Sequence, residues 1–309
     1  MRARVISIIL IMLISIIPSS TAGQPEKLDN VGAVFGGVHI NATSAGNISL
    51  DFSEMPAIVE DYTATWCTNC VDVEHALNDV EETNNMQQYH FHRFISESED
   101  PLGSQEGDDR WIERYEQRLP PTVIFNGTIQ QIGNVPAGDS LQDDYNSNLE
   151  SPLDIGDGFS SLGWMPDEGN MSGLVAWNLN VDMANFPANS TIKSSIWVVE
   201  TLAYFPDGSN GEDYYYESVI GIIELGESPN GTKEITLPPA YDDNDLEIHL
   251  IHEVVLPEPA DMEEENPEES DKEEENPEED DEGVLPNISL LAVLTITMFA
   301  AIIVQRKQL

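Results

Sequence analysis

The two cysteines of this 309-residue chain lie three positions apart, in the stretch ATWCTNC that runs from Ala64 to Cys70. A disulfide that closes a loop of about four residues removes only about 2 kcal/mol of unfolded-state entropy, so a stabilising crosslink would sensibly join distant segments instead. Zinc needs four ligands, and no second cysteine pair or tight histidine pair accompanies Cys67 and Cys70. The chemistry that suits this C-x-x-C pair is thiol–disulfide exchange.

The pair is predicted to lie at the start of a helix over about residues 70–82. Apolar residues recur there on one face at helical spacing, namely Val73, Ala76, Leu77 and Val80. At such a position, free backbone N–H groups and the helix dipole favour a thiolate at Cys67. Cys70, one turn later, is close enough to resolve a mixed disulfide. Asp72 and Glu74 add negative charge, which should oppose thiolate formation.

The region around the pair, from about residue 55 to residue 151, alternates strand and helix patterns. We expect strands at PAIVEDYTA and YHFHRFIS, and a short helix at DDRWIERYEQRL that stops at two prolines. PTVIFNG and IQQIGNV read as a hairpin with Asn126-Gly127 as its turn, and SLQDDYNSNL reads as a closing helix.

These residues resemble the thioredoxin superfamily over about positions 31–151. DYTATWCTNC places Asp61 six positions before Cys67, and PPTVIFNG resembles the family's cis-proline loop followed by a hairpin. The resemblance implies that Asp61 is a buried carboxylate beneath Cys70, which assists deprotonation of that thiol. It also implies that Pro121 is a cis-proline opposite the disulfide and helps to hold the backbone of the substrate.

The activity that this resemblance implies is thiol–disulfide exchange without a cofactor or a metal. Trp66 and Thr122 fall at positions where the substrate would be bound. Three departures matter. Pro120 has no N–H for the substrate backbone, the intervening Thr68-Asn69 leaves the direction of the reaction open, and the third is the negative charge of Asp72 and Glu74 noted above. His90 and His92 share a face of one predicted strand, and we interpret them as half-buried strand residues rather than as a metal pair.

Residues 152–256 change character. Strand-like runs such as GLVAWNLNVDM, TIKSSIWVVETLAYF, YYYESVIGIIELG and LEIHLIHEVVL are separated by turn clusters, with no helical pattern between them. This spacing predicts an all-β sandwich. In the YYY run, at least one of the three rings is expected to face the core.

The two ends of the chain predict export and anchoring. Residues 1–23 have the basic start, short apolar run and small residues of a signal peptide. Residues 284–304 form an uncharged run long enough to span a bilayer, and residues 305–309 would be a cytoplasmic tail. Removal of the helix by a sortase-like enzyme is the alternative. Seven N-x-S/T sequons are consistent with an exported glycoprotein.

Charge limits the partners of the chain. It has 57 acidic and 12 basic residues and a formal net charge of −45. The composition of residues 257–283 predicts an acidic, disordered linker. Such a field repels nucleic acid and anionic lipid headgroups. We interpret the excess as adaptation to salty surroundings, where charges are screened over about 8 Å or less, in preference to a cation-binding role.

The sequence therefore predicts an α/β thioredoxin-like domain over residues 24–151, an all-β sandwich domain over residues 152–256, an acidic stalk and a single C-terminal transmembrane helix. The expected function is a membrane-tethered thiol–disulfide oxidoreductase, with most of the chain outside the cytoplasm. Its partners would be thiols or disulfides of exported proteins, or a membrane electron carrier. The alternative is a non-catalytic adhesion or ligand-binding protein in which the first domain is a scaffold and the sandwich is the binding module.

Overall fold

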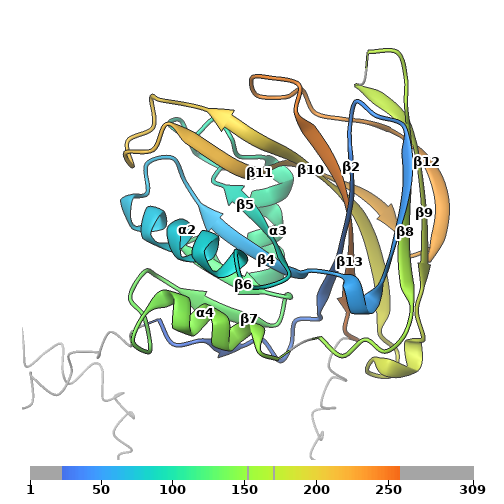
Figure 1. Cartoon of the computed structure of the whole chain (residues 1–309), viewed down its shortest axis with the longest axis horizontal. Helices are drawn as coiled ribbons and strands as arrows, with labels where there is room; N and C mark the ends of the chain where they lie inside the picture. The colour runs from blue at the N-terminus through green and yellow to red at the C-terminus, as the bar shows by residue number, and fades with distance from the viewer. Residues whose placement is uncertain (1–22, 152, 170, 258–309) are drawn as a thin grey trace, which may run out of the picture. The chain divides into compact units, whose positions relative to one another are not determined.

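The computed structural model describes residues 23–151, 153–169 and 171–257, all of which lie in the first of two compact units, Met1–Pro259 and Ala260–Leu309. The described chain is mostly β, with 42% of residues in strands and 17% in helices. Its strands form a nine-stranded and a four-stranded sheet (Figure 1).

The nine-stranded sheet has the order β1-β7-β6-β4-β5-β11-β10-β13-β2. It is mixed, because β5 pairs in parallel with both β4 and β11 while the other neighbours are antiparallel. Its strands are β1 Glu26–Lys27, β2 Val34–Asn41, β4 Ala57–Thr63, β5 Met86–His92, β6 Thr122–Phe125, β7 Ile129–Ile132, β10 Thr191–Tyr204, β11 Tyr214–Gly226 and β13 Leu246–Val255.

The four-stranded sheet packs against one part of the nine-stranded sheet. Its order is β12-β9-β8-β3, with β3 Gly46–Asp51, β8 Phe159–Pro166, β9 Ser172–Asn180 and β12 Asn230–Thr236. The core between the sheets combines Leu162, Trp164 and Val175 from the small sheet with Ile196, Leu250 and Val38 from the large one. This part of the molecule is a two-layered β structure of the sandwich kind.

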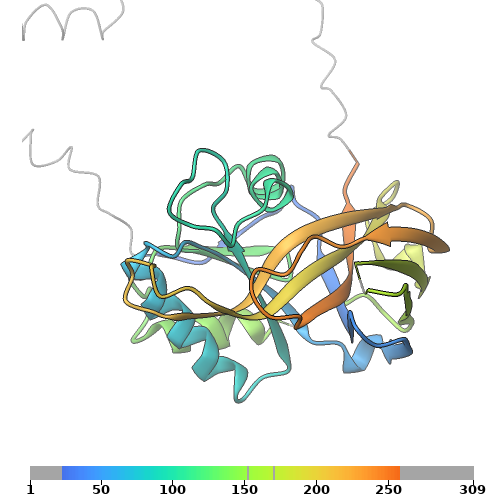
Figure 2. The same cartoon turned by 90° about the horizontal axis from the view of Figure 1, so that it is seen from above.

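Three α-helices cover the other part of the large sheet: α2 Thr68–Glu81, α3 Gln105–Tyr115 and α4 Leu141–Leu149, with short 3-10 turns at Phe52–Glu54 and Met183–Asn185. Figure 2 shows α3 on one face of the sheet, and α2 with α4 on the opposite face. The hydroxyl groups of Ser104 and Ser140 cap the N-termini of α3 and α4.

This architecture corrects the predicted fold class. The chain is not an α/β thioredoxin-like domain followed by a separate sandwich, because one sheet draws strands from both predicted parts. β11 pairs with β5 at Ser218 and His90. β2 and β3, which come before the cysteines, pair with β13 and β8. Patterns local in sequence predict elements, whereas these pairings join segments far apart in the chain.

The predicted single-pass anchor is also not supported: within the described residues, no helix has the length and apolar character needed to cross a bilayer. The predicted transmembrane helix over residues 284–304 and the tail over residues 305–309 lie outside the described residues. The signal peptide and the acidic linker lie outside them too, except for Gly23 and Pro257.

A buried histidine joins the two sheets. His252 of β13 in the large sheet is 0% exposed, and its two ring nitrogens lie 2.8 Å from the hydroxyl groups of Ser160 in β8 and Ser194 in β10. Burial lowers the pKa of His252 to about 3. The folded protein therefore holds this ring neutral, whereas the unfolded chain binds a proton below about pH 6.5.

Acid should therefore destabilise the protein through His252. Between pH 7 and pH 5 the unfolded state gains a proton that the folded state does not bind, and the free energy of unfolding should fall by about 2 kcal/mol from this group. Urea unfolding at both pH values should show this loss reduced in His252→Asn and kept in His75→Asn, since His75 is exposed. Equal losses in all three proteins would contradict the assignment.

Candidate redox site

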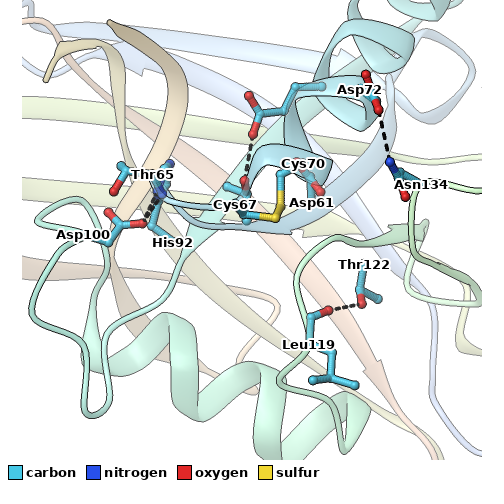
Figure 3. Close-up of a disulfide and its surroundings, with 12 residues drawn as sticks. Asp61, Thr65, Cys67, Cys70, Asp72, His92, Asp100, Leu119, Thr122 and Asn134 are labelled. Atoms are coloured by element: carbon cyan, nitrogen blue, oxygen red, sulfur yellow. Dashed lines mark hydrogen bonds and ion pairs between the residues drawn. A yellow bond between two sulfur atoms is a disulfide. The ribbon is translucent and has the colours of Figure 1, made fainter. Parts of the chain in front are cut away.

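Cys67 and Cys70 form a disulfide at the N-terminus of α2, with their Cα atoms 5.3 Å apart (Figure 3). Cys67 is the N-cap residue and is 6% exposed, and Cys70 lies in the first turn and is 0% exposed. The first N–H groups of a helix have no intrahelical partner, so they offer hydrogen bonds and a favourable dipole to negative charge at Cys67.

The backbone just before the disulfide is fixed from two directions. The N–H of Thr65 donates to Asp100 Oδ2 at 2.8 Å. The carbonyl oxygen of Thr65 accepts from the N–H groups of Ser209 and Asn210, at 3.0 and 3.1 Å, in the turn between β10 and β11. The β-rich part of the chain thus contributes directly to the position of Cys67, which local sequence patterns do not predict.

Asp61 lies on β4 opposite His90 of β5, and both side chains are buried. The Oδ2 atom of Asp61 and the Nδ1 atom of His90 are 3.1 Å apart, whereas Asp61 Oδ1 is buried and has no hydrogen-bond partner among the described residues. Figure 3 shows Asp61 on the strand behind Cys70, in the surroundings of the disulfide. One carboxylate oxygen is therefore held by His90 while the other is free to accept a proton.

Glu74 extends this polar cluster from α2. The Thr63 hydroxyl donates to Glu74 Oε1 at 2.7 Å. Burial raises the pKa of Glu74; the charge on His90 opposes this shift and the charge on Asp61 adds to it. Burial would lower the pKa of His90, but the hydrogen bond and charge of Asp61, with Glu74, raise it instead. Glu74 and His90 therefore keep their protons to higher pH than the isolated side chains would.

A small cavity of about 20 Å³ adjoins this cluster, lined by Glu74, Asn78, His90, His92, Tyr215 and Tyr216. A space of roughly this size holds one water when polar groups surround it. Tyr215 and Tyr216 come from β11, and Tyr216 is 57% exposed while Tyr215 is buried. The buried Tyr215 agrees with the expectation that one ring of the YYY run faces the core. The cavity therefore places a polar space beside His90 and Glu74.

Asp61, Glu74 and His90 also bring one potential metal-ligand atom each within 4.8 Å of one another. The hydrogen bonds between Asp61 and His90 and between Thr63 and Glu74 already occupy some of these potential ligand atoms. The neighbouring His92 has a different partner, since its Nδ1 lies 2.8 Å from Asp100 Oδ2. Both histidines are more buried than the sequence predicts.

The peptide bond between Pro120 and Pro121 is cis. Leu119 and Thr122 flank it, and Figure 3 shows them on the side of the disulfide away from α2. Thr122 is buried, and its hydroxyl donates to the carbonyl of Leu119 at 2.6 Å, so that hydroxyl serves the loop. Leu119 itself is 65% exposed and presents an apolar surface beside the prolines.

Trp66 is half-buried, and its Nε1 donates to Glu97 Oε2 at 2.8 Å. On α2, Asp72 accepts from the side-chain amide of Asn134 at 3.0 Å (Figure 3).

The structure thus gathers Cys67, Cys70 and Asp61 at one place. Sequence reasoning missed the roles of other residues here, namely Thr65, Glu74, His90, Asp100 and Tyr215. Polar residues alternating within two apolar strands, Asp61 with Thr63 and His90 with His92, were the available signal.

No family model and no curated protein matches the sequence. Among solved structures, the chain is similar to HBP35 of Porphyromonas gingivalis, with 12% identity and a TM-score of 0.42 over 65% of this chain and 73% of that one. It is also similar to protein AGR_C_4864 of Agrobacterium tumefaciens, with 13% identity and a TM-score of 0.36 over 58% of this chain and 78% of that one. At these TM-scores neither likeness supports a conclusion about function.

Proposed function

We propose that this chain is a thiol–disulfide oxidoreductase that acts on thiols or disulfides of other proteins through Cys67 and Cys70. The observation that carries the proposal is the buried Asp61 carboxylate beside Cys70 (Figure 3). One of its oxygens is bonded to His90, and the other has no partner within the part of the chain that the structure describes. A crosslink that only stabilised the fold would need no such group.

In the reducing direction, the Cys67 thiolate attacks one sulfur of a substrate disulfide. A bond forms between Cys67 Sγ and that sulfur, and the other substrate sulfur leaves as a thiolate that takes a proton from water. The N-terminus of α2 stabilises the attacking thiolate. Cys67 is the reasonable attacking residue because its side chain keeps some exposure, whereas Cys70 has none.

In the second step, Cys70 resolves the mixed disulfide. Its thiol gives a proton to Asp61, its sulfur attacks Cys67 Sγ, and the second substrate sulfur leaves as a thiolate. His90 stabilises the Asp61 carboxylate before this transfer, and the cavity beside His90 and Glu74 offers a path by which the proton later leaves. Each step is reversible, so a dithiol substrate would reduce the same disulfide.

The surface around the disulfide suits a polypeptide rather than a small charged molecule. Leu119 is exposed beside the cis peptide bond, and Trp66 is half-buried at the start of the helix. Apolar contacts with these side chains can replace the backbone hydrogen bond that Pro120, lacking an N–H, cannot donate.

Serine variants should separate the two steps. With a disulfide-containing protein such as scrambled ribonuclease, reduced Cys70→Ser should accumulate a mixed disulfide because attack occurs without resolution. Cys67→Ser should form none and should lose turnover. Non-reducing electrophoresis measures both results. Turnover by Cys67→Ser equal to that of the wild type would defeat the proposal.

Asp61→Asn should slow resolution specifically. The amide keeps the shape of the side chain but cannot accept the Cys70 proton, and loss of a general base typically costs about 100-fold or more. Stopped-flow measurement at pH 7 should show attack by Cys67 little changed and decay of the mixed disulfide slowed by about that factor. Asp72→Asn, which removes one charge from α2, is the matched control and should resolve normally. A similar effect in both variants would count against a proton-transfer role.

A second candidate is a non-catalytic ligand-binding role, which an exposed aromatic surface favours. Tyr204 pairs with Tyr214 across β10 and β11, with ring centroids 5.0 Å apart, and Leu202 pairs with Tyr216. All four side chains are exposed by 37% or more. If binding by this surface were the function, Cys67→Ser would leave ligand binding intact and the disulfide would resist reduction.

A further inference from the structure

Three carboxylates converge at a second place, away from the disulfide. Glu200 lies on β10, between β11 and β13, and is 0% exposed. Asp242 and Asp245 lie in the connection from β12 to β13, where Asp242 is exposed and Asp245 is half-buried. One oxygen from each of the three residues lies within 4.8 Å of the others.

One oxygen of each carboxylate accepts hydrogen bonds that hold the β12–β13 connection to β10. Glu200 Oε2 accepts from the N–H of Tyr241 at 2.9 Å. Asp245 Oδ2 accepts from the hydroxyl of Thr201 at 2.7 Å and from the N–H of Leu202 at 3.0 Å, and Asp242 Oδ2 accepts from the N–H of Tyr204 at 2.7 Å. These bonds fix the three side chains in position.

The remaining oxygens of the two inner carboxylates are left without a partner. Glu200 Oε1 and Asp245 Oδ1 are both buried and neither has a hydrogen-bond donor among the described residues. No Lys, Arg or His in that part of the chain forms an ion pair with any of the three. A buried carboxylate oxygen without a donor or a counter-charge is costly, so a cation or a proton must compensate this cluster.

The donor set selects among cations. All available ligands are oxygens, which suit a hard ion such as Ca²⁺. Two oxygens that each lie about 2.4 Å from one Ca²⁺ are at most about 4.8 Å apart. The three carboxylates each have an oxygen within 4.8 Å of the others, so they are close enough to share one ion. The exposed Asp242 leaves one side open, so water can supply further ligands.

We propose that Glu200, Asp242 and Asp245 form a binding site for Ca²⁺. The ion would neutralise the two unpartnered oxygens and hold the β12–β13 connection against β10. The competing account is a proton shared between Glu200 and Asp245, since burial and the charge of Asp245 raise the pKa of Glu200 to about 7. Calcium at neutral pH separates the two accounts, because only a metal site responds to it.

The test is the thermal unfolding of the purified full-length chain at pH 7.5, after treatment with a chelator and then with increasing Ca²⁺. The stability of the wild type should rise with the concentration of free Ca²⁺. When that concentration is 100 times the Kd, the ratio of folded to unfolded protein should be about 100-fold higher than without calcium. Glu200→Gln should lose this response and, without calcium, should unfold at the wild-type temperature or above, because a buried charge is gone. This second result shows that the variant folds.

Glu234→Gln is the matched control, since Glu234 is exposed on β12 and its loss changes the net charge equally. Glu234→Gln should keep the full calcium response. Any calcium bound by the acidic residues 257–283 would be the same in both variants, so it does not explain a difference between them. The proposal would be overturned if calcium failed to stabilise the wild type, or if Glu200→Gln responded as the wild type does.

Discussion

The structure depends on the burial of Asp61 beside a buried disulfide. A carboxylate removed from water is costly unless a hydrogen bond or a positive charge compensates it, and His90 on the neighbouring strand supplies that partner. On the other side of β5, β11 pairs with the strand at His90 and contributes Tyr215 and Tyr216 to the cavity beside the ring. The continuity of the nine-stranded sheet, which corrects the predicted fold, therefore also helps to enclose the candidate redox site.

The two faces of β4 show how one strand serves two purposes. On the face toward α2, Asp61 and Thr63 meet His90 and Glu74. On the face toward α3, Glu60 is 0% exposed and bonds to the guanidinium of Arg110, with Nε–Oε2 and Nη2–Oε1 distances of 2.7 and 3.0 Å. Arg110 also pairs with Glu253 of β13 and lies 4.7 Å from the ring centroid of Trp197. Ion pairing therefore holds α3 to both β4 and β13, while the opposite face carries the site.

Local sequence patterns predict the elements around the site. Apolar spacing predicts α2 within two residues, Asn126-Gly127 predicts the turn between β6 and β7, and the C-x-x-C pair falls at the start of the helix. Pairing between distant strands left no such pattern. Nothing near Ser218 indicates that β11 runs beside His90, and the short strands β2 and β3 give no sign that they join β13 and β8. The hydrogen bonds from Ser209 and Asn210 to Thr65, and the meeting of Glu200 with Asp245, arise from the same long-range pairing and could not be read in advance.

The reduction potential of the Cys67–Cys70 disulfide tests the central claim most directly. The full-length protein would be equilibrated with thiol buffers of graded potential, its free thiols alkylated, and the reduced fraction measured by mass. A helix N-terminus beside Cys67 and a proton acceptor beside Cys70 predict a reversible two-electron transition between about −270 and −120 mV, the range of dithiols that exchange electrons. A disulfide that stays oxidised until the potential falls below about −300 mV, as structural disulfides do, would contradict the account.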